Sequence, residues 1–71
     1  MASSYRRILG ETIRARRKQA RVSQEKLAEK ADLNPKYLSE VERGRANISL
    51  DALVRISKAL KVHLRDLVRG I

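Results

Sequence analysis

Apolar residues along this chain recur at spacings of three and four, and no long segment alternates between apolar and polar positions. Spacings of three and four place side chains on one face of an α-helix, whereas alternation would place them on one face of a strand. The single proline and the three glycines are scattered, so no segment has the composition of a linker. We therefore predict an all-α fold of five helices in one domain, residues 1–71, since so short a chain cannot bury two cores.

The first helix is predicted from Ser4 to Ala20, with Ser3 or Ser4 as its N-cap. Four apolar residues are expected to form its inward-facing stripe: Tyr5, Ile8, Leu9 and Ile13. The other faces are almost wholly basic. The side chains expected to form a solvated surface with a diffuse attraction for polyanions are Arg14, Arg16, Lys18 and Arg21.

Polar caps mark where two short helices begin. Ser23 is placed to cap the second helix, and Asn34 is placed to cap the third. Pro35 follows at the first helical position, where its missing N–H carries no penalty. Gly44 supplies a left-handed exit after Arg43.

The two short helices form an angled pair, because only Ala31 to Leu33 join them. The apolar positions that bury one side of the pair are Leu27, Ala28, Ala31, Leu33, Leu38 and Val41. The opposite side of the third helix presents the polar set Pro35, Lys36, Ser39 and Glu40, which suits the edges of DNA bases. This pattern predicts a helix-turn-helix unit at residues 24–43.

Two further helices are predicted after the unit. Ser49 is placed to cap a fourth helix whose apolar residues are Leu50, Leu53, Ile56, Ala59 and Leu60. A short fifth helix is expected from about His63, with the apolar residues Leu64, Leu67 and Val68.

Charge points to a polyanionic partner. Seventeen Lys and Arg against eight Asp and Glu give a net charge of +9, so nucleic acid is the first candidate. A cationic peptide at a membrane surface would show the same balance, but the chain has no Trp or Phe to anchor it there. No apolar run approaches the length of a membrane span, and the N-terminus lacks the features of a signal peptide. We expect a cytoplasmic protein that does not bind membranes.

Catalysis is not expected from this inventory of side chains. The chain has no cysteine, one histidine and no glycine-rich loop to cradle a phosphate, and it is too short to enclose a substrate. We therefore predict no enzyme activity, no cofactor, no metal and no small-molecule ligand. RNA remains an alternative polyanion, although few aromatics are present to stack on unpaired bases.

Two segments, SQEKLAEKADLNPKYLSEVERG and NISLDALVRISKALKV, resemble helices two to four of the lambda-repressor-like, or Cro and Xre type, regulators. The resemblance covers Tyr5 to Val68, and the YLSEVERGRANISL stretch is most similar to the controller proteins of restriction-modification systems. It implies a sequence-specific regulator of transcription that binds double-stranded DNA, associated with the nucleoid of a bacterium or with a phage. Two positions depart from the family pattern, Asp32 in the turn and Lys61 after the fourth helix, where glycine is usual because both positions favour a positive φ.

The resemblance implies that the third helix enters the major groove. The candidate base-reading residues are Pro35, Lys36, Tyr37, Ser39 and Glu40. Lys36 can donate to guanine O6 and N7, or be an ordinary solvated lysine. Glu40 can accept from cytosine N4, or pair with a neighbouring cation. Tyr37 can pack against the protein, or reach a phosphate or a thymine methyl.

Backbone contacts and one ion pair are also implied by the resemblance. The candidate phosphate-binding residues are Ser23, Gln24, Arg43, Arg45 and Asn47, and such contacts position a protein without specifying sequence. Gln24 matches the family residue whose side chain and backbone N–H meet the DNA backbone. Arg17 and Glu42 match a partly buried ion pair between the first and third helices, with a structural role.

One short helix reads only a few base pairs, so we expect a homodimer on a palindromic operator. The candidate interface residues are Leu64, Leu67, Val68 and Ile71. The alternative is that Leu64 and Leu67 close the core of the monomer. A second hypothesis for the whole chain is an antitoxin or protein-interaction module in which DNA binding is secondary.

Overall fold

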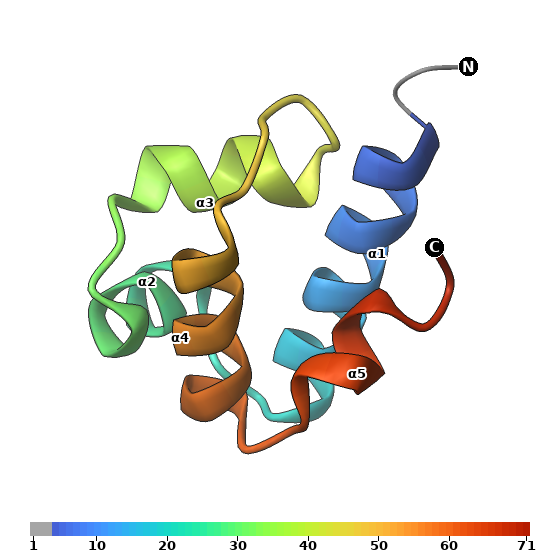
Figure 1. Ribbon diagram of the computed structural model, residues 1–71. Coiled ribbons are helices and arrows are strands. Elements are labelled where there is room, and N and C mark those ends of the chain that lie inside the picture. Colours follow the sequence, from blue (N-terminus) through green and yellow to red (C-terminus); the bar gives the residue numbers. More distant parts are fainter. Residues whose placement is uncertain (1–3) are drawn as a thin grey trace.

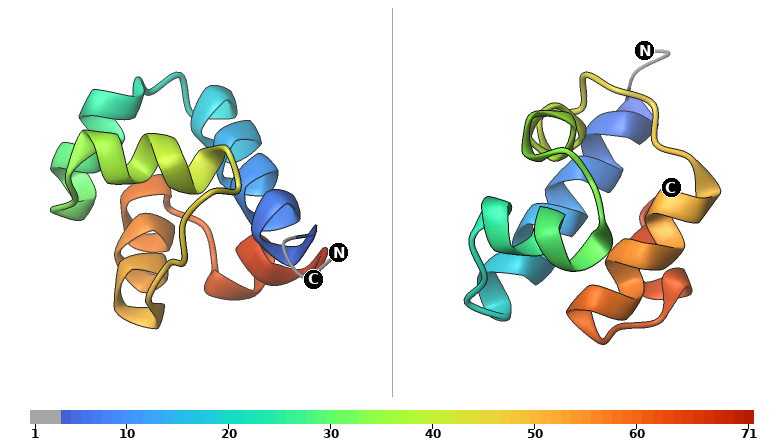
Figure 2. Two further views of the ribbon diagram at one scale, coloured as in Figure 1. Left: turned by 90° about the horizontal axis from the view of Figure 1, so that it is seen from above. Right: turned by 90° about the vertical axis from the view of Figure 1, so that its left-hand side faces the viewer.

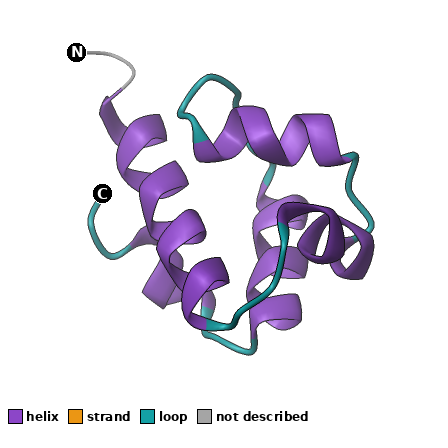
Figure 3. Ribbon diagram, turned by 180° about the vertical axis from the view of Figure 1, so that it is seen from behind, coloured by secondary structure: helices purple, strands orange, loops and turns teal. Residues whose placement is uncertain are grey.

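The computed structural model describes residues 4–71, and this part of the chain contains five helices, as predicted. They are α1 (Ser4–Gln19), α2 (Gln24–Ala31), α3 (Pro35–Glu42), α4 (Leu50–Leu60) and α5 (Leu64–Val68) (Figure 1). Loops connect them without any strand among the described residues (Figure 3). The predicted cap at Ser3 lies outside the described residues.

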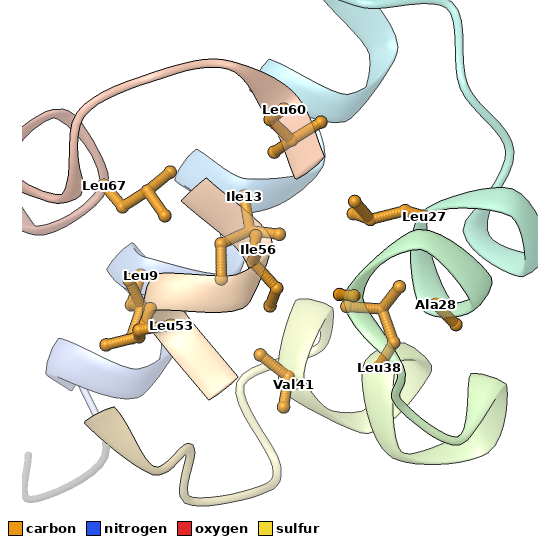
Figure 4. Close-up of a cluster of buried hydrophobic side chains, with 11 residues drawn as sticks. Leu9, Ile13, Leu27, Ala28, Leu38, Val41, Leu53, Ile56, Leu60 and Leu67 are labelled. Atoms are coloured by element: carbon orange, nitrogen blue, oxygen red, sulfur yellow. The ribbon is translucent and has the colours of Figure 1, made fainter. Parts of the chain in front are cut away.

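The helices enclose one core to which all five contribute (Figure 4). α2 packs on both α3 and α4, while α1 packs on α3 and α5. The side chains gathered between the helices are Leu9, Ile13, Leu27, Ala28, Ala31, Leu38, Val41, Leu53, Ile56, Leu60 and Leu67. Between residues 4 and 71, no helix has the length and apolar character that crossing a membrane requires.

The predicted caps of α2, α3 and α4 form. The Ser23 hydroxyl accepts the Lys26 N–H at 3.0 Å, and the Ser49 hydroxyl accepts the Ala52 N–H at 3.0 Å. At the start of α3, the side-chain oxygen of Asn34 accepts the backbone N–H groups of the next turn. Local side-chain oxygens therefore fix where α2, α3 and α4 begin.

Among residues 4–71, four have the left-handed conformation. Asp32 (φ 56°) and Lys61 (φ 59°) take it despite their side chains, so both departures from the family pattern keep the family's turn geometry. Gly44 (φ 75°) takes it as predicted, and Arg21 (φ 60°), which the sequence analysis did not single out, takes it after α1. The cost of this conformation for a side-chain-bearing residue, about 1–2 kcal/mol, is offset by the packing of the helices on either side.

Two predicted apolar positions are exposed. Tyr5 is 47% exposed and Leu50 is 65% exposed, although periodicity placed Tyr5 in the inward stripe and grouped Leu50 with the apolar face of its helix. Both lie in the first turn of a helix. Periodicity gives the direction of a side chain but not how far the covering surface reaches.

Gly10 sets how closely α1 approaches α3. A Cβ atom at this position would lie 2.3 Å from the Val41 carbonyl oxygen and 2.8 Å from that of Glu42. No side chain fits there, so the backbone of α1 rests directly on the last turn of α3. This contact positions the end of α3 relative to the basic faces of α1.

Candidate functional site

An ion pair joins α1 to α3, as the sequence analysis predicted. Arg17 Nε donates to Glu42 Oε2 at 2.8 Å and a terminal nitrogen donates to Oε1 at 3.1 Å, with the two side chains 11% and 2% exposed. The other terminal nitrogen of Arg17 donates to the Val22 carbonyl at 2.9 Å. Gln24 Nε2 adds a third donor, at 2.9 Å from Glu42 Oε1. One buried carboxylate thus ties the start of α2 to α1 and α3.

Beside this network lies a polar hollow of about 500 Å³ at the junction of α1, α2 and α3. Its lining residues are Arg14, Arg17, Ser23, Gln24, Glu25, Ser39, Glu42 and Arg43. Four predicted DNA-contacting residues, Ser23, Gln24, Ser39 and Arg43, are therefore brought together although they are spread over twenty positions of the sequence. The positive end of the α2 dipole also faces this region, which favours an anion.

The donors in the polar hollow retain capacity for a phosphate. The Ser23 hydroxyl acts as an acceptor in its cap, so its own O–H is still available to donate. The Gln24 amide uses one N–H for Glu42 and has a second. Arg14 on α1 and Arg43 at the end of α3 add two guanidinium groups. The guanidinium groups of Arg14, Arg17 and Arg43 outnumber the carboxylates of Glu25 and Glu42, so the hollow can hold a phosphate oxygen by positive charge and by hydrogen-bond donors.

The N-terminal end of α3 is exposed. Pro35 and Lys36 are both on the surface, and Lys36 forms no ion pair within residues 4–71. Asn34 Oδ1 accepts the backbone N–H groups of Lys36 at 2.8 Å and Tyr37 at 3.4 Å. Recognition at this end of α3 therefore depends on side chains.

Tyr37 and Glu40 have protein partners. The Tyr37 hydroxyl donates to the Asn47 carbonyl at 2.8 Å, and its half-buried ring packs against the core. Glu40 Oε2 lies 3.9 Å from a terminal nitrogen of Arg43. These contacts favour the packing alternative for Tyr37 and the ion-pair alternative for Glu40. A DNA contact by either residue stays a prediction.

The loop between α3 and α4 lies against the start of α1. A Cβ at Gly44 would lie 2.8 Å from the Arg7 Cα, so the loop can approach this closely only with glycine there. The exposed side chains of Arg43, Arg45 and Asn47 project from this loop. The approach places Arg7 beside the basic loop.

Arg7 is not among the residues that the sequence predicted for the site, and Arg14 was predicted only as part of a diffuse basic surface. A signal was present, because residues seven apart on a helix share a face. Arg7 and Arg14 lie on the face of α1 that meets the loop and the polar hollow. α1 has several basic faces, and only the way that α1 crosses α3 shows which of them meets the loop and the polar hollow.

The candidate interface on α5 needs a correction. Leu67 is fully buried in the monomer core, with 0% of its surface exposed, so it has none to offer a partner. Leu64 and Val68 are half-buried against the same core, and Ile71 is 58% exposed. A short amphipathic helix does not reveal whether its apolar face covers its own domain or a second copy.

Comparison with known proteins shows which family this chain resembles. A family model described as helix-turn-helix matches residues 13–67. Control protein C.BamHI from Bacillus amyloliquefaciens is 44% identical over 69 residues, which cover 96% of this chain and 85% of that protein. The immunity repressor of Bacillus phage phi105 is 40% identical over 60 residues, but these are only 42% of its length.

Solved structures agree with this result. The restriction-modification controller protein C.AhdI from Aeromonas hydrophila superposes with a TM-score of 0.86 and 34% identity, covering 87% of this chain and 94% of that one. The clp gene regulator ClgR from Corynebacterium glutamicum gives 0.89 and 35%, covering 92% and 69%. The five-helix arrangement is therefore shared along nearly the whole of C.AhdI.

Proposed function

Because this chain belongs to the Cro/Xre-type helix-turn-helix family of DNA-binding transcriptional regulators, we propose that it binds a palindromic operator as a symmetric dimer. Residues 1–71 act as one DNA-binding domain with the helix-turn-helix unit at 24–43. The observation that carries the proposal is the polar hollow, which lies beside α3 and gathers phosphate-binding donors from three helices.

Phosphate contacts orient α3 in the major groove. One DNA phosphate sits at the polar hollow, held by Ser23, Gln24 and Arg43 with help from Arg14. A second is held at the α3–α4 loop by Arg45 and Asn47, with Arg7 beside them. The Arg17–Glu42 pair does not touch DNA, but it holds Gln24 and the end of α3 in place.

Lys36 reads the bases, supported by Pro35 and Ser39. Its side chain is exposed at the end of α3 that enters the groove, and its ammonium can donate to guanine O6 and N7. Glu40 lies near Arg43, so its carboxylate offsets part of the positive charge there. It leaves Arg43 only if it accepts a hydrogen bond from cytosine N4.

Dimerisation supplies the rest of the specificity. Two copies related by a two-fold axis place two α3 helices in half-sites about 34 Å apart. Regulation then follows protein concentration through the monomer–dimer step. Of the interface residues expected on α5, Leu64, Val68 and Ile71 retain surface for a partner.

The regulated genes belong to a restriction-modification system in this proposal. Support comes from C.BamHI and C.AhdI, both controller proteins, which this chain matches along 85% and 94% of their lengths. A regulator of this kind acts in the cytoplasm of a bacterium, at the nucleoid.

Selection of bound duplexes from a random pool tests the proposal. We expect enrichment of an inverted repeat whose half-sites are centred about 10 base pairs apart, one helical turn. Recovery of direct repeats or of single unpaired sites would contradict the symmetric dimer. Recovery of no preferred sequence would contradict base reading itself.

A further inference from the structure

The first turn of α4 carries an exposed leucine next to an apolar hollow. Leu50 is 65% exposed, more than any other large hydrophobic residue of the described chain. The hollow has a volume of about 200 Å³, and its apolar walls are Tyr5, Leu9, Val41, Ile48 and Leu53. Leu53 follows Leu50 by one helical turn, so the protruding side chain and the hollow adjoin.

The hollow has the size and chemistry to take up a leucine side chain. An apolar cavity of about 150 Å³ binds a molecule as large as benzene, and the isobutyl group of leucine is smaller. A single exposed leucine needs no explanation in a soluble protein. An exposed leucine beside an apolar hollow is different, because together they form a surface that complements itself.

We propose that a second copy of this chain docks on this surface, with Leu50 of each copy entering the apolar hollow of the other. A two-fold interface requires self-complementarity, since residue i of one copy contacts residue j of its partner and the reverse. The inference rests on the proposed function, which requires a dimer, and it moves the centre of the interface from α5 to the start of α4.

The charged residues around the apolar hollow also favour a second copy of this chain as the partner. Asp51 follows Leu50, is exposed, and forms no ion pair within the described residues. Arg6 lines the apolar hollow, and its Nε atom is buried without a hydrogen-bond partner. When Leu50 of one copy enters the apolar hollow of the other, the neighbouring Asp51 comes close to Arg6 of that second copy. Two such contacts offset part of the repulsion between two chains of charge +9.

The position of this surface suits the DNA geometry. Half-sites about 34 Å apart put each α3 about 17 Å from the two-fold axis, and the chain measures only 31 × 23 × 21 Å. Because the chain is this small, the surface through which the two copies touch must lie close to α3. The loop from the end of α3 leads directly to the start of α4, on the side of the molecule away from α2 (Figure 2).

Sedimentation equilibrium of two matched variants tests the interface. Leu50→Asp and Ile71→Asp each place a charge at an exposed apolar position, the first at the proposed surface and the second beyond α5. Each dimer buries Leu50 twice, so we expect Leu50→Asp to raise the dimer dissociation constant at least about 100-fold. Ile71→Asp should raise it by a much smaller factor, because the centre of the interface lies at the start of α4 rather than at α5. Unaltered dimerisation of Leu50→Asp, or dissociation caused by Ile71→Asp instead, would overturn the proposal.

Charge reversal tests the pairing of Asp51 with Arg6. Arg6→Glu and Asp51→Arg should each weaken the dimer, and the double variant should recover most of the loss. Recovery is not expected from a variant that merely unfolds, and urea unfolding of each variant checks this. Additive losses in the double variant would show that the two side chains do not meet.

DNA binding separates this inference from the proposed function. Leu50→Asp should bind a duplex with one half-site nearly as tightly as the unaltered chain, since it removes only one unit of the net charge of +9, and should lose mainly the added affinity for the full operator. Loss of half-site binding by this folded variant would contradict the interface role. If the unaltered chain itself prefers no sequence, the proposed function fails, whatever the sedimentation result.

Discussion

At Glu42, a side chain that is only 2% exposed accepts hydrogen bonds from Arg17 and from Gln24. A buried carboxylate with three N–H donors is satisfied, whereas the same carboxylate without Arg17 would be a buried charge with one donor. Gln24 also lines the polar hollow. The same residue-scale contact therefore contributes both to stability and to the geometry of the proposed phosphate site.

Removing the arginine should destabilise the fold. We expect Arg17→Ala to lower the free energy of unfolding by about 3–5 kcal/mol, because it strands the Glu42 carboxylate. Denaturant unfolding measures this change, and Arg14→Ala is the matched control because Arg14 is exposed. The double change Arg17→Met with Glu42→Leu should restore much of the loss, and if it is as unstable as Arg17→Ala alone, the stranded charge is not the cause.

Two basic residues should affect DNA binding in different ways. Lys36→Ala should cost about 1–3 kcal/mol on the selected operator and relax the preference at one position of the half-site. Arg43→Ala should weaken all duplexes alike and reduce the slope of log K against log salt by about 0.9 for each phosphate that it no longer neutralises. Titration of labelled operator and random duplexes at several salt concentrations measures both effects.

An exposed lysine on another surface provides the control for these variants. Lys30 lies in the last turn of α2, so Lys30→Ala should change neither the preference nor the slope by as much. Equal losses on operator and random DNA for Lys36→Ala would remove it as a base reader. An unchanged salt slope for Arg43→Ala would show that this arginine binds no phosphate.

At the scale of helices, ends and crossings have different origins. The starts of α2, α3 and α4 depend on hydrogen bonds that span at most three residues, which is why sequence alone located them. The crossing of α1 and α3 depends on Gly10, whose Cα faces carbonyl groups about thirty positions away. No local pattern reveals such a contact.

Adding one carbon at this crossing should separate the two helices. Gly10→Ala places a Cβ against the backbone of α3, which cannot rotate away, so we expect a loss of about 1–3 kcal/mol of unfolding free energy. This loss should exceed the gain of up to about 1 kcal/mol that alanine brings to a helix. Thermal and denaturant unfolding measure the balance.

Gly70 is a matched position for this comparison. A Cβ there would meet only the Cγ2 methyl of Ile8, at 3.0 Å, which is a side-chain atom and not a backbone carbonyl. Gly70→Ala should therefore change stability less than Gly10→Ala. A Gly10→Ala protein more stable than the unaltered chain would show that α1 can shift at no cost.

At the scale of the molecule, a net charge of +9 on a chain of 71 residues should dominate the strength of DNA binding. A dimer that makes six to ten phosphate contacts is expected to lose about 10³- to 10⁵-fold in affinity between 50 and 200 mM salt. Titration of the selected operator across this range measures the loss. Affinity that hardly changes with salt would contradict the proposed set of phosphate contacts.

The sequence by itself determined the five helices, the caps of α2, α3 and α4, the helix-turn-helix unit and the family. These depend on periodicity, on capping side chains and on motifs, all of which act between residues close in the chain. Asp32 and Lys61 show how strongly the family's turns are specified, because both adopt a positive φ without glycine.

Only the tertiary structure decided which surfaces these elements cover. It buried Leu67, exposed Leu50 and Tyr5, turned the Tyr37 hydroxyl onto Asn47, and assembled the polar hollow from three helices. Helical periodicity assigns a face to each of these side chains, but burial depends on how far the neighbouring helices extend. How the helices lie against one another depends on contacts between residues far apart in the sequence. At Gly10 and Gly44, for example, the absence of a side chain allows a distant segment of backbone to come close.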